Sequence, residues 1–216
     1  MPDSDSVYKP PSSDVVVKQE LPQEYENGQL THVKLRTLAW ISIVNVVIVT
    51  VIVALSILNG FGLEEKSYEN LYHALMIVSM IIWAYIMIMF KSFLNLRFNY
   101  TKTNSLIYIL IALSVIMTIV SLFMSETSSY RETATIAYIV LLVPTGIVTI
   151  LFGIRLLKLS DEFRYVNSFA WINIVYGVCT TSIVLLVVAV PLALVSDFFV
   201  ALIFFEAARE RSPRRL

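Results

Sequence analysis

The sequence is short of cysteine and histidine. Its 216 residues include one cysteine, Cys179, and two histidines, His32 and His73. A lone cysteine excludes an intramolecular disulfide, and its position inside an apolar run predicts a small core residue. The two histidines lie on different segments and do not form a zinc-binding pair. We therefore expect no metal site and no cofactor.

Charge is also scarce. Only 15% of the residues are charged and the formal net charge is zero, whereas about 25% of an average soluble domain is charged. The chain has no concentrated basic face of the kind that binds nucleic acid. It also lacks the P-loop, the dinucleotide fingerprint, Gly-x-Ser-x-Gly and His-Glu-x-x-His. We therefore predict that it is not an enzyme.

Apolar residues dominate instead, at 57% of the chain with a mean hydropathy of +0.76. A chain of this length could not bury so much apolar surface in one core, so the bilayer is its expected solvent. Continuous runs of about 20 apolar residues indicate helices rather than the strands of a barrel. We predict an all-α membrane protein with six transmembrane helices, at residues 38–58, 71–90, 105–124, 134–157, 169–190 and 192–208.

The last apolar region, 169–208, is about twice as long as one span requires. We expect a hairpin that turns at Pro191, because proline breaks a helix and restricts the residue before it. The arm after Pro191 is short, which leaves five spans as an alternative.

Basic residues predict the orientation of the chain, since Lys and Arg concentrate on the cytoplasmic side. The gap after the second span, the gap after the fourth span and the C-terminal tail are rich in them, and the Pro191 turn has none. This alternation predicts cytoplasmic tails at 1–36, which is polar and disordered, and at 209–216, which is basic. Five spans would leave the C-terminal arginines outside, so the pattern favours six.

The odd-numbered spans resemble one another. TLAWISIVNVVIVT, SLIYILIALSVIMT and SFAWINIVYGVCTT align without a gap from Thr37, Ser105 and Ser168, which predicts an internal repeat of three tandem helical hairpins. The three hydroxyl residues are candidates to cap the helix starts. Three residues further on, the aromatic residues of the repeat are expected to anchor each helix at the membrane interface. These anchors are Trp40, Tyr108 and Trp171.

A few polar residues and one proline interrupt the spans. Asp197 follows the expected turn closely, so it either caps the last helix or belongs to an ion or proton path. Asn173, Gly177 and Thr181 are spaced i, i+4, i+8 on one helix face, and Asn45 lies in the first span. Such a face packs helices closely or lines a substrate path. Pro144, with Gly146, is expected to kink the fourth span, as in broken transporter helices. The candidate positions are Asp197, Asn173, Gly177, Thr181, Asn45 and Pro144.

The N-terminal segment Val7-Tyr8-Lys9-Pro10-Pro11 resembles the short Tyr-x-Pro-Pro-type tail of uncharacterised multi-pass inner-membrane proteins of proteobacteria. The resemblance implies a bacterial cytoplasmic membrane and no particular activity.

Two functions fit this pattern. Short loops and helix-packing faces predict a non-enzymatic subunit, scaffold or envelope factor that contacts lipid and either a membrane-protein partner or a second copy of itself. The loops after the second and fourth spans mix basic and aromatic residues that suit such contacts. The alternative is a small transporter or channel, which Asp197, Asn173 and Pro144 favour.

Overall fold

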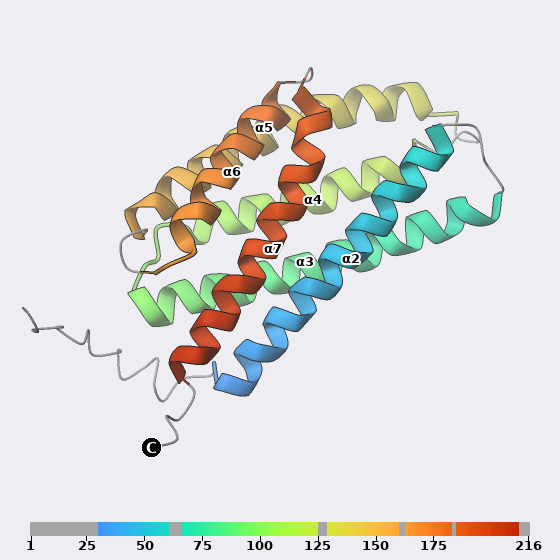
Figure 1. Ribbon diagram of the computed structural model, residues 1–216. Coiled ribbons are helices and arrows are strands. Elements are labelled where there is room, and N and C mark those ends of the chain that lie inside the picture. Colours follow the sequence, from blue (N-terminus) through green and yellow to red (C-terminus); the bar gives the residue numbers. More distant parts are fainter. Residues whose placement is uncertain (1–29, 61–65, 125–128, 160–162, 183–184, 212–216) are drawn as a thin grey trace, which may run out of the picture.

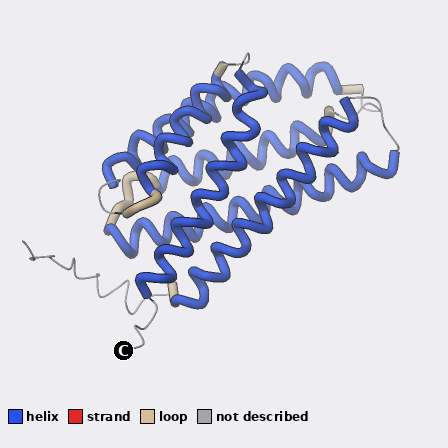
Figure 2. Tube along the Cα trace, in the orientation of Figure 1, coloured by secondary structure: helices blue, strands red, loops and turns tan. Residues whose placement is uncertain are grey.

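The computed structural model describes residues 30–60, 66–124, 129–159, 163–182 and 185–211 (Figure 1). These residues form six α-helices and one short 3₁₀ helix, and no strand lies among them (Figure 2). The predicted all-helical class is therefore confirmed. The elements are α2 (His32–Gly60), α3 (Lys66–Phe98), α4 (Asn104–Leu122), α5 (Arg131–Leu156), η1 (Leu157–Leu159), α6 (Val166–Thr181) and α7 (Leu186–Arg211).

Five of these helices are long and apolar enough to cross a membrane, and α6 is the exception. Its 16 residues extend about 24 Å at 1.5 Å per residue, less than the ~30 Å of a hydrocarbon core. By length and composition, therefore, the described residues contain five helices that could span a membrane, and the six predicted spans are not confirmed.

The turn of the last hairpin lies earlier than predicted. Ser182 leaves the helical conformation, with ψ of 104°, and its carbonyl accepts a hydrogen bond from the Leu185 N–H. Pro191 lies inside α7. A membrane helix tolerates a proline, because neighbouring groups can compensate for the one backbone hydrogen bond that is lost. The predicted boundary between 169–190 and 192–208 is therefore wrong, since α6 ends at Thr181 and α7 begins at Leu186.

The predicted helix caps are also wrong. The first helix begins at His32, and the Thr31 hydroxyl accepts the Lys34 N–H at 3.3 Å, so Thr37 lies inside α2. Ser105 and Ser168 likewise lie inside α4 and α6.

The three aromatic residues of the repeat point outward, with 55%, 53% and 55% of Trp40, Tyr108 and Trp171 exposed.

The helices form a closed ring in which each packs on the next along the chain and α7 packs on α2. The most extensive contacts join α5 to α6 and α2 to α7, which belong to different predicted hairpins. The three hairpins are therefore not confirmed as packing units, and the internal repeat stays a prediction.

The start of α2, the end of α3, η1 and the end of α7 lie at one end of the bundle, which we call the termini end (Figure 1). The end of α2, the end of α4 and the junction of α6 with α7 lie at the opposite end. Large apolar side chains are exposed on all six helices, among them Val47, Ile81, Ile116, Val140, Val178 and Val187. A surface of this kind suits contact with lipid.

Glycines bring α5 and α6 into backbone contact. A Cβ atom on Gly177 would lie 2.6 Å from the Gly146 carbonyl oxygen, and one on Gly153 would lie 2.7 Å from the Ala170 carbonyl oxygen. Small residues allow membrane helices to approach this closely and to gain van der Waals contact. This pair of helices therefore forms one wall of the bundle.

Candidate solute-binding cavity

All six helices surround a cavity of about 390 Å³. Its lining runs along α2 from Asn45 to Ile52 and along α4 from Leu110 to Ser121. Ser121 is next to the last residue of α4, and Thr180 is next to the last residue of α6. The cavity therefore starts in the middle of the bundle and extends toward the opposite end.

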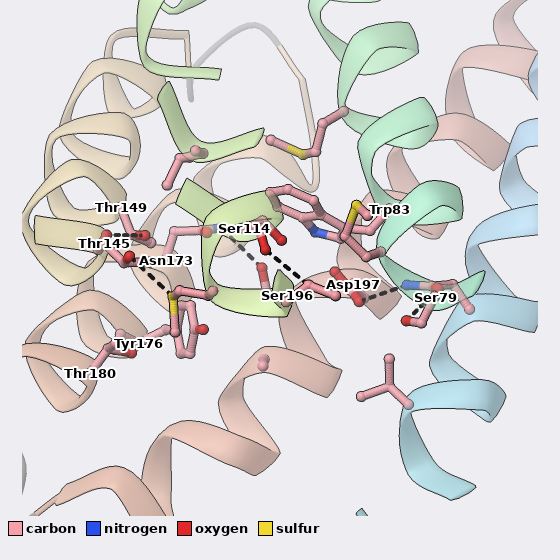
Figure 3. Close-up of a pocket in the computed structure, with 18 of the residues that line it drawn as sticks. Ser79, Trp83, Ser114, Thr145, Thr149, Asn173, Tyr176, Thr180, Ser196 and Asp197 are labelled. Atoms are coloured by element: carbon pink, nitrogen blue, oxygen red, sulfur yellow. Dashed lines mark hydrogen bonds between the residues drawn. The ribbon is translucent and has the colours of Figure 1, made fainter. Parts of the chain in front are cut away.

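A chain of hydrogen bonds crosses three helices at the cavity wall (Figure 3). The Ser79 hydroxyl on α3 donates to Asn45 Oδ1 on α2 at 3.0 Å, and Asn45 Nδ2 donates to Asp197 Oδ2 on α7 at 3.3 Å. The indole of Trp83 on α3 lies beside the Asp197 carboxylate at the same cavity wall. The carboxylate is therefore held at the cavity by a neutral amide of α2, which a hydroxyl of α3 orients in turn.

The neighbouring residue on α7 contacts the other side of the bundle. Asn173 Nδ2 on α6 donates to Ser196 Oγ at 3.1 Å and to its own helix at the Phe169 carbonyl, 2.8 Å away. Ser196 and Asp197 thus connect α7 to α6 on one side and to α2 on the other.

A cluster of phenylalanines closes the cavity toward the termini end. We call this cluster the aromatic layer, and its ring centroids lie 5.4 to 6.4 Å apart, mostly edge to face. Two members, Phe152 and Phe169, also line the cavity and form its floor. The layer consists of Phe90, Phe93, Phe98, Phe152, Phe163, Phe169 and Phe204.

Polar contacts join the helices beyond this layer. The Arg97 side chain, 8% exposed, pairs with Glu210 at 3.2 Å and so connects α3 to α7. The Tyr100 hydroxyl donates to the Arg155 carbonyl at 2.9 Å. Burial raises the pKa of Tyr100 above its ordinary value, although the nearby Arg155 opposes this, so the phenol stays protonated at neutral pH and keeps its hydrogen bond. The termini end is therefore closed by an aromatic layer and by polar bonds below it.

Three of the predicted polar residues meet at the cavity. Asn45 and Asp197 bond directly, and Asn173 lies beside Ser196. Asp197 lies in the interior of α7, eleven residues after its start, so it does not cap that helix. Pro144 lies elsewhere, on the exposed outer side of α5.

The predicted polar stripe of α6 divides between two faces. Gly177 and Thr181 contact Gly146 of α5 and pack that pair of helices. The residues of α6 that line the cavity include Asn173, Tyr176 and Thr180, spaced i, i+3, i+7. Residues at that spacing also lie on one helix face. Two polar stripes therefore begin at Asn173, and the predicted stripe is the one that packs against α5.

Several polar residues of the lining were not predicted from the sequence. Thr145 and Thr149 are spaced i, i+4 beside Pro144, and Ser79 and Trp83 have the same spacing on α3. This spacing was a usable signal, because polar residues one turn apart in an apolar helix share a face. The missed residues are Ser79, Trp83, Ser114, Thr118, Ser121, Tyr138, Thr145, Thr149, Tyr176, Thr180 and Ser196.

Within the part of the chain that the structure describes, no group of three or more His, Cys, Asp or Glu residues lies close enough to hold a metal ion. No protein-family model, no curated protein and no solved structure matches the chain.

Proposed function

We propose that the protein is a small membrane transporter whose cavity binds a small solute. The observation that carries this proposal is the cavity itself, which has polar side chains from all six helices and a carboxylate in the middle of the bundle. Polar groups inside a membrane are costly and lie at substrate paths or proton relays in many membrane proteins. A protein that works only by association has no need of such an interior.

The closure at one end favours a transporter over an open channel. The aromatic layer and the Arg97–Glu210 pair lie between the cavity and the termini end. A solute that enters from the opposite end meets this barrier, so passage requires a second conformation in which the barrier opens. The association function that the sequence predicts stays a prediction, as does the absence of enzymatic activity.

We also propose that α6 crosses the membrane together with α7, which makes six spans, and that the termini end faces the cytoplasm of a bacterial inner membrane. Two observations support this. The start of α2 and the end of α7 lie at the same end of the bundle (Figure 1), as expected for an even number of crossings. Most described basic residues lie there too, among them Lys34, Lys91, Arg97, Arg155, Lys158 and Arg209, as the positive-inside rule predicts.

The test of solute binding is thermal unfolding of the purified full chain in mild detergent against small solutes of four kinds: amines, carboxylates, sugars and neutral amino acids. A solute at about 100 times its Kd stabilises the folded state by about 2.7 kcal/mol, or roughly 5 to 10 °C for a chain of this length. We expect at least one kind to produce such a shift. Liposomes that contain the protein should then take up that solute.

Two variants on one helix control for the site. Thr149→Phe fills the cavity and should abolish the shift, whereas Ile147→Phe adds the same ring to the exposed side of α5 and should retain it. If no solute stabilises the unmodified chain, or if both variants respond alike, the cavity does not bind solutes and the proposal is wrong.

A further inference from the structure

The described part of the cavity lining carries negative charge without a positive residue beside it. Asp197 is an acidic residue of the lining, and among the described residues that surround the cavity there is no Lys, Arg or His. The Asn45 amide that donates to its carboxylate and the Trp83 indole beside it are neutral. They orient the carboxylate without compensating its charge, and an uncompensated charge in a membrane interior is costly. A cationic ligand would supply the missing positive charge.

The hydroxyl groups of the lining present acceptors to the cavity. A hydroxyl has one proton and two lone pairs, and five of these hydroxyls already give their proton to a backbone carbonyl in their own helix. Their oxygens therefore offer lone pairs to a ligand. The five residues are Thr118, Ser121, Thr145, Thr149 and Thr180. A ligand that carries N–H donors would match this lining better than one that carries acceptors.

The rest of the lining is mostly apolar and includes aromatic and thioether groups. Trp83, Tyr138 and Tyr176 contribute rings, and Met76, Met80 and Met117 contribute flexible, polarizable side chains. Ring faces attract cations, and methionine adapts to apolar groups of various shapes. A cavity of about 390 Å³ is near the lower end of the range for small-molecule sites, which is ~300 to 1,000 Å³. The ligand should therefore be small and partly apolar.

From these three features we infer that the cavity binds a small protonated amine with an apolar body, with Asp197 as its counter-ion. The inference rests on the proposed solute-binding function and names the class of solute. The ammonium group lies at the Asp197 carboxylate, donates to it and to neighbouring hydroxyl oxygens, and has the indole of Trp83 beside it. The apolar body lies against the methionines.

The test compares amines with neutral molecules of the same shape. Methylammonium, butylammonium, benzylammonium and phenethylammonium chlorides are added to the full chain in detergent at pH 7, each beside the matching alcohol, and the unfolding midpoint is measured. Benzoate and sodium chloride complete the set. We expect at least one ammonium ion to raise the midpoint by several degrees and its alcohol to have at least a tenfold weaker effect. This comparison needs no variant.

Two variants then locate the charge. Asp197→Asn keeps the size of the side chain and should weaken ammonium binding at least tenfold, and Trp83→Leu should weaken it to a smaller extent. An alcohol that stabilises as well as its amine, or an amine shift that survives Asp197→Asn, would overturn the inference.

Other outcomes separate this inference from the proposed function. If benzoate, a sugar or another solute without an ammonium group stabilises the chain and Thr149→Phe abolishes the shift, the cavity binds solutes but the amine class is wrong. If only sodium stabilises it in an Asp197-dependent way, the site holds an inorganic cation and the amine class is again wrong. If no solute has any effect, both proposals fail.

Discussion

Gly177 shows how much of this fold depends on the absence of one side chain. Its Cα atom faces the backbone of α5. The nearest neighbours of an added Cβ would be the Gly146 carbonyl oxygen at 2.6 Å, the Ile150 Cγ1 atom at 2.7 Å and the Ile150 backbone nitrogen at 2.9 Å. Backbone atoms in a helix cannot move aside as the end of a flexible side chain can. The α5–α6 contact must therefore widen if this position gains even one carbon atom.

We predict that Gly177→Ala destabilises the protein. Alanine favours the helix by about 1 kcal/mol over glycine, but overpacking of a close contact costs roughly 1–3 kcal/mol, and here the whole α5–α6 wall has to shift. The unfolding midpoint in detergent should fall by several degrees. Val178→Ala is the matched control, because Val178 is 48% exposed on the outer side of α6 and should tolerate the change. Equal midpoints for the two variants would contradict the close contact.

At the scale of the helix, Pro191 does not end a helix, although proline commonly does. It is exposed and lies inside α7, and an alanine there would restore the N–H that bonds the Val187 carbonyl one turn earlier.

We predict that Pro191→Ala leaves the unfolding midpoint unchanged or raises it. Pro144→Ala should behave in the same way, because Pro144 has an equivalent exposed position inside α5. If Pro191 formed the turn between two helices, the alanine variant would instead lose stability, by about 0.4–1 kcal/mol or more from the freer unfolded chain alone. A drop in the midpoint for Pro191→Ala with no drop for Pro144→Ala would therefore restore the turn at Pro191.

The helices that the sequence predicts well are those bounded by charged and polar gaps. The predicted span 71–90 lies within α3, and the predicted span 105–124 overlaps α4 except for its last two residues. A hydropathy pattern marks where lipid contact begins and ends. Hydropathy gives no such mark between α6 and α7, where one apolar run contains both helices. Proline was the wrong signal there, and the polar Thr180-Thr181-Ser182 run before the turn was the better one.

The cavity could be predicted only in part. Asn45, Asn173 and Asp197 stand out in apolar helices, but their partners Ser79 and Ser196 do not, because serine is common in membrane helices. Which polar residues share the cavity depends on how far each helix is rotated about its axis. That rotation is set by contacts between helices, such as the contact of Gly146 with Gly177. A single sequence does not show which residues of two helices will contact one another.

At the scale of the whole molecule, we predict that both chain termini lie on the cytoplasmic side. A reporter that folds only in the cytoplasm should fluoresce when fused to residue 1 or to residue 216, and should stay dark when inserted after Gly60, at the opposite end of α2. A dark C-terminal fusion beside a bright N-terminal one would mean that α6 does not cross the membrane. It would also contradict the even number of crossings.

If α6 crosses the membrane as we propose, its short length has a consequence for the bilayer around the protein. A hydrophobic length of about 24 Å is below the thickness of the surrounding hydrocarbon, and lipids respond to such a mismatch by thinning locally. Since Thr180 and Ser182 lie at the end of α6 where the cavity extends, the thinned region would be on that side. Headgroups and water would then reach further down α6 than along the other five helices, which shortens the distance that a polar solute must travel from water to Asp197.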